Sequence, residues 1–177
     1  MNWPNRLSIL RVCLIPVLML LLSLSIPWCG AAAAAVFALA CFTDFLDGHL
    51  ARKNQWITTF GKFIDPVADK LLVLSTMIML TELHLVPAWM VVLILARELS
   101  VDGLRMVAVS RGKVISAGPL GKIKTASQML MILMILIFRF PLYSSPVGIV
   151  FGVWVCFITI WSGTDYFLQN RSVFTSD

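Results

Sequence analysis

The chain has 177 residues, of which 59% are hydrophobic and 13% are charged, and its formal net charge is +5. A mean hydropathy of +0.91 excludes an ordinary soluble domain and indicates an integral membrane protein. The basic residues are spread along the chain, which fits an anionic membrane surface and phosphorylated substrates better than nucleic acid. We therefore expect a membrane protein without a nucleic-acid partner.

Apolar segments predict an all-α integral membrane protein with six transmembrane helices, in one membrane domain that covers residues 1–177. The expected helix ranges are 7–27, 31–52, 62–83, 86–110, 119–140 and 146–168. Prolines and a glycine mark the joints between these helices: Pro27, Gly30, Pro87, Pro119, Pro141 and Pro146. The first apolar segment is too long for the core of a signal peptide, so we expect it to remain as a span.

Lysine and arginine residues predict the orientation of these helices. Arg6 and Arg11 are expected to flank the first span, and most other basic residues lie in the loops after the second and fourth helices. On the opposite side only Arg139 is basic. By the positive-inside rule, both termini and the basic loops face the cytoplasm, in a multi-pass protein of the cytoplasmic (inner) membrane.

Four of the nine acidic residues lie close together in this apolar chain, at Asp44, Asp47, Asp65 and Asp69. The first two are three positions apart and the last two are four apart, so each pair occupies one face of its helix. Gly61 is expected to break the chain between the two helices and to let them run antiparallel. The two carboxylate faces can then meet, at the cytoplasmic end of the membrane.

A carboxylate cluster within a membrane requires a compensating positive charge, because each intramembrane charge costs on the order of 2.5–3.5 kcal/mol. Hard divalent cations such as Mg²⁺ or Mn²⁺ prefer oxygen ligands, and two such ions form a common clamp for displacement at phosphorus. A single aspartate could instead be the salt-bridge partner of Lys70 or Arg97. Intramembrane acids also occur in cation transporters, although this chain has no internal repeat.

The string from Asp44 to Asp69 resembles the signature of the CDP-alcohol phosphotransferase family at every defined position. It reads Asp44-x-x-Asp47-Gly48-x-x-Ala51-Arg52, then eight residues, Gly61, three residues, Asp65, three residues and Asp69. The resemblance implies a membrane enzyme that breaks the pyrophosphate of a CDP-linked substrate and releases CMP. It also implies two divalent ions per active site, Mg²⁺ or Mn²⁺, and a homodimer.

The resemblance further implies a role for each residue of the string. All four aspartates hold the metal ions, and Asp69 is also the base that deprotonates the attacking hydroxyl. The chemistry agrees, because an alcohol at neutral pH needs a base within hydrogen-bond reach. The CDP group is bound by Asp47, Gly48, Ala51, Arg52 and Gly61.

Four other segments resemble the bacterial phosphatidylglycerophosphate synthases, one branch of this family: 4–11, 96–105, 111–114 and 120–125. This resemblance implies CDP-diacylglycerol as donor and sn-glycerol 3-phosphate as acceptor. The chain departs from that branch at Ser8, Asp102 and Pro119, and Asp102 adds a negative charge near the predicted phosphate pocket. A cardiolipin synthase and a phosphatidylinositol phosphate synthase of the same family are therefore alternatives.

Basic residues on the cytoplasmic side support a phosphorylated acceptor, because glycerol 3-phosphate carries close to two negative charges. We expect the acceptor phosphate to be bound by Arg105, Lys113, Lys122 and Lys124. The same residues could instead be ordinary cytoplasmic charges that set the topology.

Two further expectations concern the fourth and sixth helices. Arg97 and Glu98 are adjacent in sequence, so we expect each to pair with another helix and not with the other. Gly148 and Gly152 are four positions apart on the sixth helix, a spacing that favours a close helix contact or a dimer seam.

Overall fold

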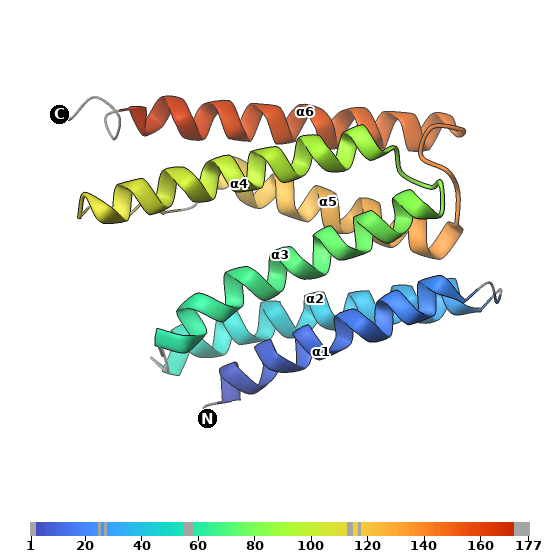
Figure 1. The fold of residues 1–177 in the computed structure, drawn as a ribbon, viewed down its shortest axis with the longest axis horizontal. Coiled ribbons are helices and arrows are strands. Elements are labelled where there is room, and N and C mark those ends of the chain that lie inside the picture. The colour runs from blue at the N-terminus through green and yellow to red at the C-terminus, as the bar shows by residue number, and fades with distance from the viewer. Residues whose placement is uncertain are drawn as a thin grey trace. The chain divides into compact units, whose positions relative to one another are not determined.

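In the computed structural model, the residues that the structure describes form six α-helices (Figure 1). The structure describes the backbone of residues 3–24, 26, 28–54, 59–112, 115–116 and 118–171, and the side chains of these residues except 3–8, 44–54 and 59–66. The helices are α1 (Trp3–Ser23), α2 (Cys29–Asn54), α3 (Thr59–Glu82), α4 (Ala88–Ser110), α5 (Pro119–Phe138) and α6 (Pro146–Gln169). None of the described residues lies in a strand. The predicted all-α fold is therefore confirmed.

The predicted helices differ from the observed ones only at their ends. α1 already begins at Trp3, because Pro4 suits a first helical turn, where the backbone N–H groups have no helical acceptor. α2 and α3 extend toward each other in sequence, to Asn54 and Thr59. The residues that join them, 55–58, lie outside the described part of the chain.

The helices are grouped into two compact units. The first unit comprises Met1–Leu85 and Ile132–Arg139, and the second comprises Val86–Met131 and Phe140–Asp177. The first part of α5 therefore belongs to the second unit, and its last residues belong to the first. That residues 1–177 form one domain stays a prediction.

In the first unit, α1 packs against both α2 and α3 (Figure 1). Leu18, Phe37 and Met77, one from each helix, are fully buried in its core. Ala33 and Ala40 of α2 are also fully buried, and their small side chains allow close helix packing. This packing holds α2 and α3, which carry the four aspartates, in one unit.

In the second unit, α4 packs along α6. Val101, Leu104 and Ala108 of α4 form a buried cluster with Tyr166 of α6. α5 joins them, because the Trp154 indole of α6 donates a hydrogen bond of 3.1 Å to Ser127 of α5. The second unit thus brings together the helices that carry the predicted acceptor residues.

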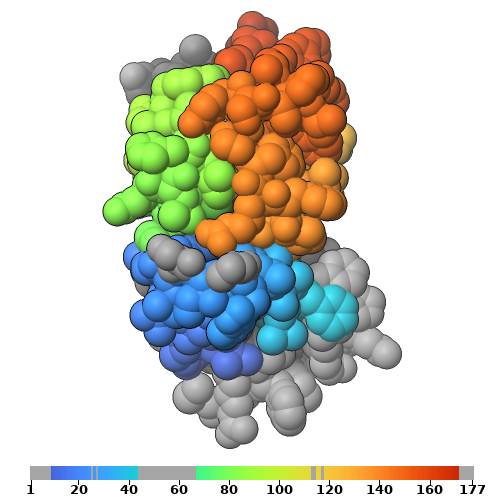
Figure 2. Space-filling view, turned by 90° about the vertical axis from the view of Figure 1, so that its right-hand side faces the viewer, coloured from blue at the N-terminus to red at the C-terminus, as the bar shows by residue number. Residues whose placement is uncertain are grey.

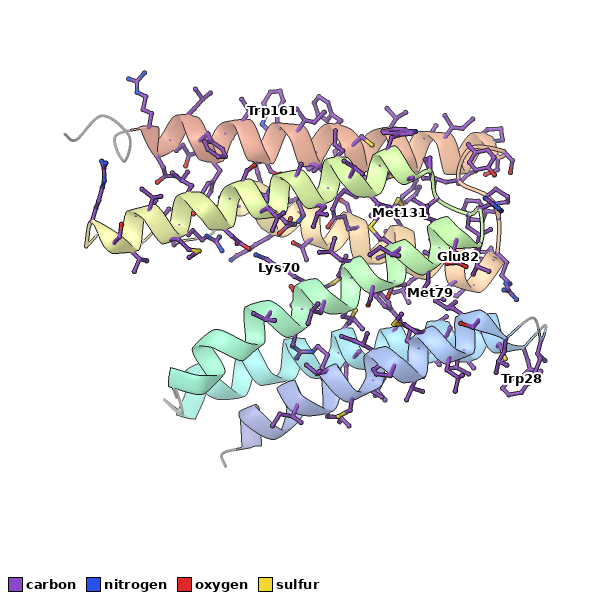
Figure 3. The ribbon with its side chains drawn as sticks, in the orientation of Figure 1. Trp28, Lys70, Met79, Glu82, Met131 and Trp161 are labelled. Atoms are coloured by element: carbon purple, nitrogen blue, oxygen red, sulfur yellow. The ribbon has the colours of Figure 1, made fainter. Side chains whose placement is uncertain are left out.

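Two of the described helices, α5 and α6, are long and apolar enough to cross a membrane. On α6, Trp154, Phe157 and Trp161 form a ladder of exposed rings, with successive centroids 6.4 and 5.6 Å apart. Figure 3 shows Trp161 directed away from the helices of its unit. Large exposed apolar side chains of this kind are typical of a membrane protein, whose outer surface contacts lipid. That all six helices span the membrane stays a prediction.

The connection between α5 and α6 covers the two glycines at the start of α6. A Cβ atom added to Gly148 would lie 2.5 Å from the backbone oxygen of Leu142, and one on Gly152 would lie 3.0 Å from the Leu142 side chain. Figure 2 shows this part of the second unit in orange, at the molecular surface. Gly148 and Gly152 are therefore buried against Leu142 of this connection, which is not a helix, so this contact is not the close helix contact that their spacing favours. The dimer seam stays a prediction.

Gly148→Ala should lower the stability of the protein by about 1–3 kcal/mol, since a backbone oxygen cannot move away from the added methyl group without shifting the connection. The measurement is the thermal unfolding midpoint in detergent. Gly103→Ala is the matched control, because a Cβ atom on this helical glycine of α4 meets nothing within 4 Å. Equal midpoints for the two variants would contradict the packing described here.

Candidate active site

The aspartate string lies on the last turns of α2 and the first turns of α3. Asp44 and Asp47 belong to the helical backbone of α2, which ends at Asn54, and Asp65 and Asp69 belong to that of α3. Figure 1 shows the end of α2 and the start of α3 at the same end of the first unit. The prediction that each pair occupies one helix is therefore confirmed, and the spacings of three and four residues place each pair on one helix face.

Gly61 does not break the chain between the helices, so that prediction is wrong. It is the third residue of α3, which begins at Thr59. A glycine is tolerated there because the first turn of a helix lacks internal acceptors for its N–H groups, so local propensity matters less than in the interior. The turn between the helices is confined to residues 55–58, outside the described part of the chain.

Asp69 is the aspartate of the string whose side chain the structure describes. It is half-buried and follows Ala68, which is fully buried, and Leu72 on the same helix is buried as well. Lys70, labelled in Figure 3, is the next residue along α3. It is also half-buried. The Asp69 side chain is thus partly shielded from solvent and partly accessible. A group that contacts a substrate must remain accessible in this way.

The donor set of the string fits divalent metal ions. Its four acidic side chains offer only carboxylate oxygens, the ligands that Mg²⁺ and Mn²⁺ prefer. The two helix ends that carry them lie in one unit, which α1 holds together. The side chains of Asp44, Asp47 and Asp65 lie outside the described set, as do those of Gly48, Ala51, Arg52 and Gly61, so their predicted roles stay predictions.

Arg11 is buried in the first unit, with only 1% of its surface exposed. It lies eight residues after the start of α1, and that it flanks the first span stays a prediction. The signal in the sequence for the burial of Arg11 was its position inside an apolar segment.

Arg105 of α4 contacts Tyr166 of α6 in the second unit. Its Nε donates a hydrogen bond of 2.9 Å to the tyrosine hydroxyl, and its guanidinium carbon lies 5.5 Å from the ring centroid. Within the described part of the chain, Tyr166 is the hydrogen-bond partner of Arg105. The two terminal NH₂ groups of the guanidinium can therefore donate to an anion, in an orientation that Tyr166 holds.

The three predicted acceptor lysines have different environments. Lys122 is exposed at the start of α5, with no ion pair to any described side chain. Lys124 is buried and forms an ion pair with Glu98 of α4. Lys113 lies outside the described residues. Among the described cations, Arg105 and Lys122 are thus better placed for a phosphate group than Lys124, whose charge Glu98 already balances.

Arg97 and Glu98 do contact each other, so one part of the prediction for this pair is wrong. Arg97 Nη1 lies 3.2 Å from Glu98 Oε1 although the two residues are adjacent on α4, because long side chains can bend toward each other. The other part is confirmed for Glu98 alone, which also pairs across to α5, with Lys124. The described residues of the second unit therefore contain a charged cluster that spacing rules alone did not predict.

Comparisons with known proteins match nearly the whole chain. The family model described as CDP-alcohol phosphatidyltransferase matches residues 1–161. A relative in Bacillus subtilis (strain 168), named CDP-diacylglycerol–glycerol-3-phosphate 3-phosphatidyltransferase, is 41% identical over 184 residues, which covers 96% of this chain and 95% of the relative. Relatives of the same name in Shigella flexneri and Escherichia coli (strain K12) are 36% and 35% identical, each covering 97% of this chain and 96% of the relative.

Proposed function

Because this chain belongs to the CDP-alcohol phosphatidyltransferase family, we propose that it transfers the phosphatidyl group of CDP-diacylglycerol to sn-glycerol 3-phosphate. The products are phosphatidylglycerophosphate and CMP, and the reaction is a step of phospholipid biosynthesis. The observation that carries the proposal is the complete aspartate string on α2 and α3, in a chain 35–41% identical to relatives that bear this activity in their names.

The reaction is a displacement at phosphorus. The primary hydroxyl of the acceptor attacks the phosphorus that bears the diacylglycerol, the bond from this phosphorus to the bridging oxygen breaks, and CMP leaves with the electron pair. Asp69 takes the proton of the attacking hydroxyl. Its partly shielded position on α3 supports this role, because a base must be reachable by the acceptor and still be protected from bulk water.

The carboxylates of Asp44, Asp47, Asp65 and Asp69 are the proposed ligands of two divalent ions, Mg²⁺ or Mn²⁺. When bound, these ions would stabilise the negative charge that develops on the phosphoryl oxygens. The CDP group is assigned to Asp47, Gly48, Ala51, Arg52 and Gly61. Arg52 supplies a positive charge for the leaving CMP, and Gly48 leaves room for the nucleotide beside the helix backbone.

The acceptor phosphate is assigned first to Arg105 and Lys122, with Lys113 and Lys124 as further members of the predicted pocket. A guanidinium can donate two parallel hydrogen bonds to a phosphate group. Tyr166 supports this assignment, because it occupies the Nε of Arg105 and leaves the terminal nitrogens for the ligand.

We propose six membrane spans in the cytoplasmic (inner) membrane, with both termini and the active site on the cytoplasmic side. The basic loops and the apolar outer face of α6 support this arrangement. The proposed homodimer rests on the family alone, because Gly148 and Gly152 are covered by their own chain.

The test is CMP release by purified protein in detergent, with CDP-diacylglycerol and Mg²⁺ or Mn²⁺. Glycerol 3-phosphate, inositol phosphate, phosphatidylglycerol and serine are offered separately as acceptors. CMP release only with glycerol 3-phosphate would support the proposal. Release with phosphatidylglycerol or inositol phosphate would assign the chain to a cardiolipin or phosphatidylinositol phosphate synthase instead. If folded protein released no CMP with any acceptor, the proposed transferase activity would be refuted.

Arg105→Met should raise the KM for glycerol 3-phosphate by about 10- to 100-fold, while the KM for CDP-diacylglycerol changes little. The reason is the loss of hydrogen bonds to a charged group, which are worth about 1.5–3 kcal/mol. Steady-state kinetics with each substrate varied in turn measures both constants. Arg171→Met, which removes an exposed arginine after α6, is the control and should leave both constants unchanged. An equal effect of the two variants would mean that Arg105 acts only through overall charge.

A further inference from the structure

Arg105 of α4 and Tyr166 of α6 carry hydrogen-bond donors that their contact with each other does not use. Arg105 Nε donates to the Tyr166 hydroxyl at 2.9 Å, so the tyrosine oxygen is the acceptor in this contact. A tyrosine hydroxyl also has one hydrogen of its own to donate. Within the described part of the chain, no oxygen accepts this hydrogen, and none accepts from the two terminal nitrogens of Arg105. Donors on both side chains are therefore available to a ligand.

The packing of α4 against α6 fixes the position of this pair (Figure 1). Tyr166 is only 6% exposed, because its ring belongs to the buried apolar cluster between the two helices. Arg105 is half-buried, and its guanidinium carbon lies 5.5 Å from the centroid of the tyrosine ring. The tyrosine hydroxyl thus lies where a partly accessible cation meets an apolar core. A ligand that binds the terminal nitrogens of Arg105 also lies near this hydroxyl.

These donors suit the oxygens of one phosphate group. The guanidinium is planar, and its terminal N–H groups can donate two parallel hydrogen bonds to a phosphate. The Nε of the same planar group holds the tyrosine oxygen, so the tyrosine O–H can donate to a further oxygen of that phosphate. A hydroxyl surrounded by apolar side chains gains more from such a bond than an exposed hydroxyl does, because little water competes for it.

We propose that the Tyr166 hydroxyl is a direct hydrogen-bond donor to the acceptor phosphate, beside the terminal nitrogens of Arg105. A phosphate monoester such as glycerol 3-phosphate has three oxygens that accept strongly, two for the guanidinium and one for the hydroxyl. In a diphosphate or a phosphodiester headgroup, one or more of these oxygens bridges to another group. The pair therefore favours glycerol 3-phosphate over the donor and over lipid headgroups. This inference rests on the proposed function, and it assigns Tyr166 to binding and not to proton transfer.

The test compares direct binding of glycerol 3-phosphate and of CDP-diacylglycerol to Tyr166→Phe, which removes the hydroxyl and keeps the ring. We expect the Kd for glycerol 3-phosphate to rise about tenfold or more, since one hydrogen bond to a charged group is lost. The Kd for CDP-diacylglycerol should stay within about twofold. Tyr143→Phe is the matched control and should change neither Kd, because it removes the hydroxyl of an exposed tyrosine in the α5–α6 connection.

A double-mutant cycle separates direct contact with the phosphate from mere orientation of Arg105. In Arg105→Met no guanidinium remains to be oriented, so only a hydroxyl that contacts the phosphate still contributes to binding. We expect the Kd of Arg105→Met/Tyr166→Phe for glycerol 3-phosphate to exceed that of Arg105→Met by at least about threefold. The same comparison provides the measurement if Tyr166→Phe does not fold, because the double variant leaves no guanidinium without its partner. Equal Kd values would overturn the inference and leave Tyr166 as a support for Arg105 only.

Three further outcomes are decisive. A lower unfolding midpoint for Tyr166→Phe with an unchanged Kd for glycerol 3-phosphate would overturn the inference and leave a packing residue. An equal or larger loss of affinity for CDP-diacylglycerol, or for phosphatidylglycerol in detergent micelles, would overturn it as well, because the phosphate bound would then be that of a lipid. Wild-type protein that binds glycerol 3-phosphate through Tyr166 without releasing CMP would refute the transferase but support the donor role, so the two failures are distinguishable.

Discussion

Asp69→Asn should lower the rate of CMP release by about 10²–10⁴-fold, which is the contribution typical of a general base. Asparagine has nearly the shape of aspartate, but its amide does not accept a proton at neutral pH and is a weaker ligand for a divalent ion. Because Asp69 is only half-buried on α3, the variant should fold, with an unfolding midpoint close to that of the wild type. Single-turnover measurements with saturating substrates separate this loss of rate from a loss of binding.

Asp165→Asn is the control for this experiment. Asp165 is a partly exposed carboxylate of α6 that accepts a hydrogen bond of 2.8 Å from Gln169, and no step of the proposed reaction uses it. Its substitution should leave the rate within about twofold of the wild type, as is usual for a surface change. If Asp69→Asn kept more than about a tenth of the wild-type rate, a base worth 10²-fold or more could not be assigned to this residue.

Removal of divalent ions with EDTA should lower CMP release to less than about 1% of the metal-loaded rate, and Mg²⁺ or Mn²⁺ should restore it. Without cations, four carboxylates at one end of the first unit repel each other and the diphosphate of the donor. Metal binding to the folded state also stabilises it, by about 2.7 kcal/mol when the free ion is at 100 times its Kd. The unfolding midpoint should therefore rise when Mn²⁺ is added, independently of catalysis.

Asp44→Asn tests whether the string holds the metal, because it removes one proposed ligand while the helical backbone of α2 can stay as it is. The rise in midpoint with Mn²⁺ should shrink in this variant and stay unchanged in Asp165→Asn. Activity that survives in protein shown to be metal-free would refute metal-assisted transfer. If Mn²⁺ raised the unfolding midpoint of Asp44→Asn as much as that of the wild type, the metal site would have to lie outside the string.

Much of the fold could be predicted because it depends on residues that are close together in sequence. Runs of apolar residues predicted six helices, and the helix ends moved by only a few residues in the structure. The same holds for the aspartate pairs, whose spacings of three and four residues need only a helical backbone to share a face. Gly61 was the exception, because a glycine near a helix end can lie on either side of the boundary.

The contacts of the second unit could not be predicted in this way. Arg105 and Tyr166 are 61 positions apart, and Glu98 and Lys124 are 26 apart. Hydropathy and helical period act over three or four residues, whereas packing of whole helices decides which faces meet. The prediction that Lys124 binds the acceptor phosphate did not include its ion pair with Glu98, because that partner lies on another helix.

The sequence by itself determined that this is an all-helical protein rich in apolar segments, and it determined the order and spacing of the aspartates, which carry the family resemblance. Only the tertiary structure decided that Arg11 is buried and that Leu142 of the α5–α6 connection covers Gly148. It also decided that Glu98 forms ion pairs with both Arg97 and Lys124. The physical reason is that a chemical group is specified by one residue, but its burial and its partners are specified by side chains from helices that meet only after folding.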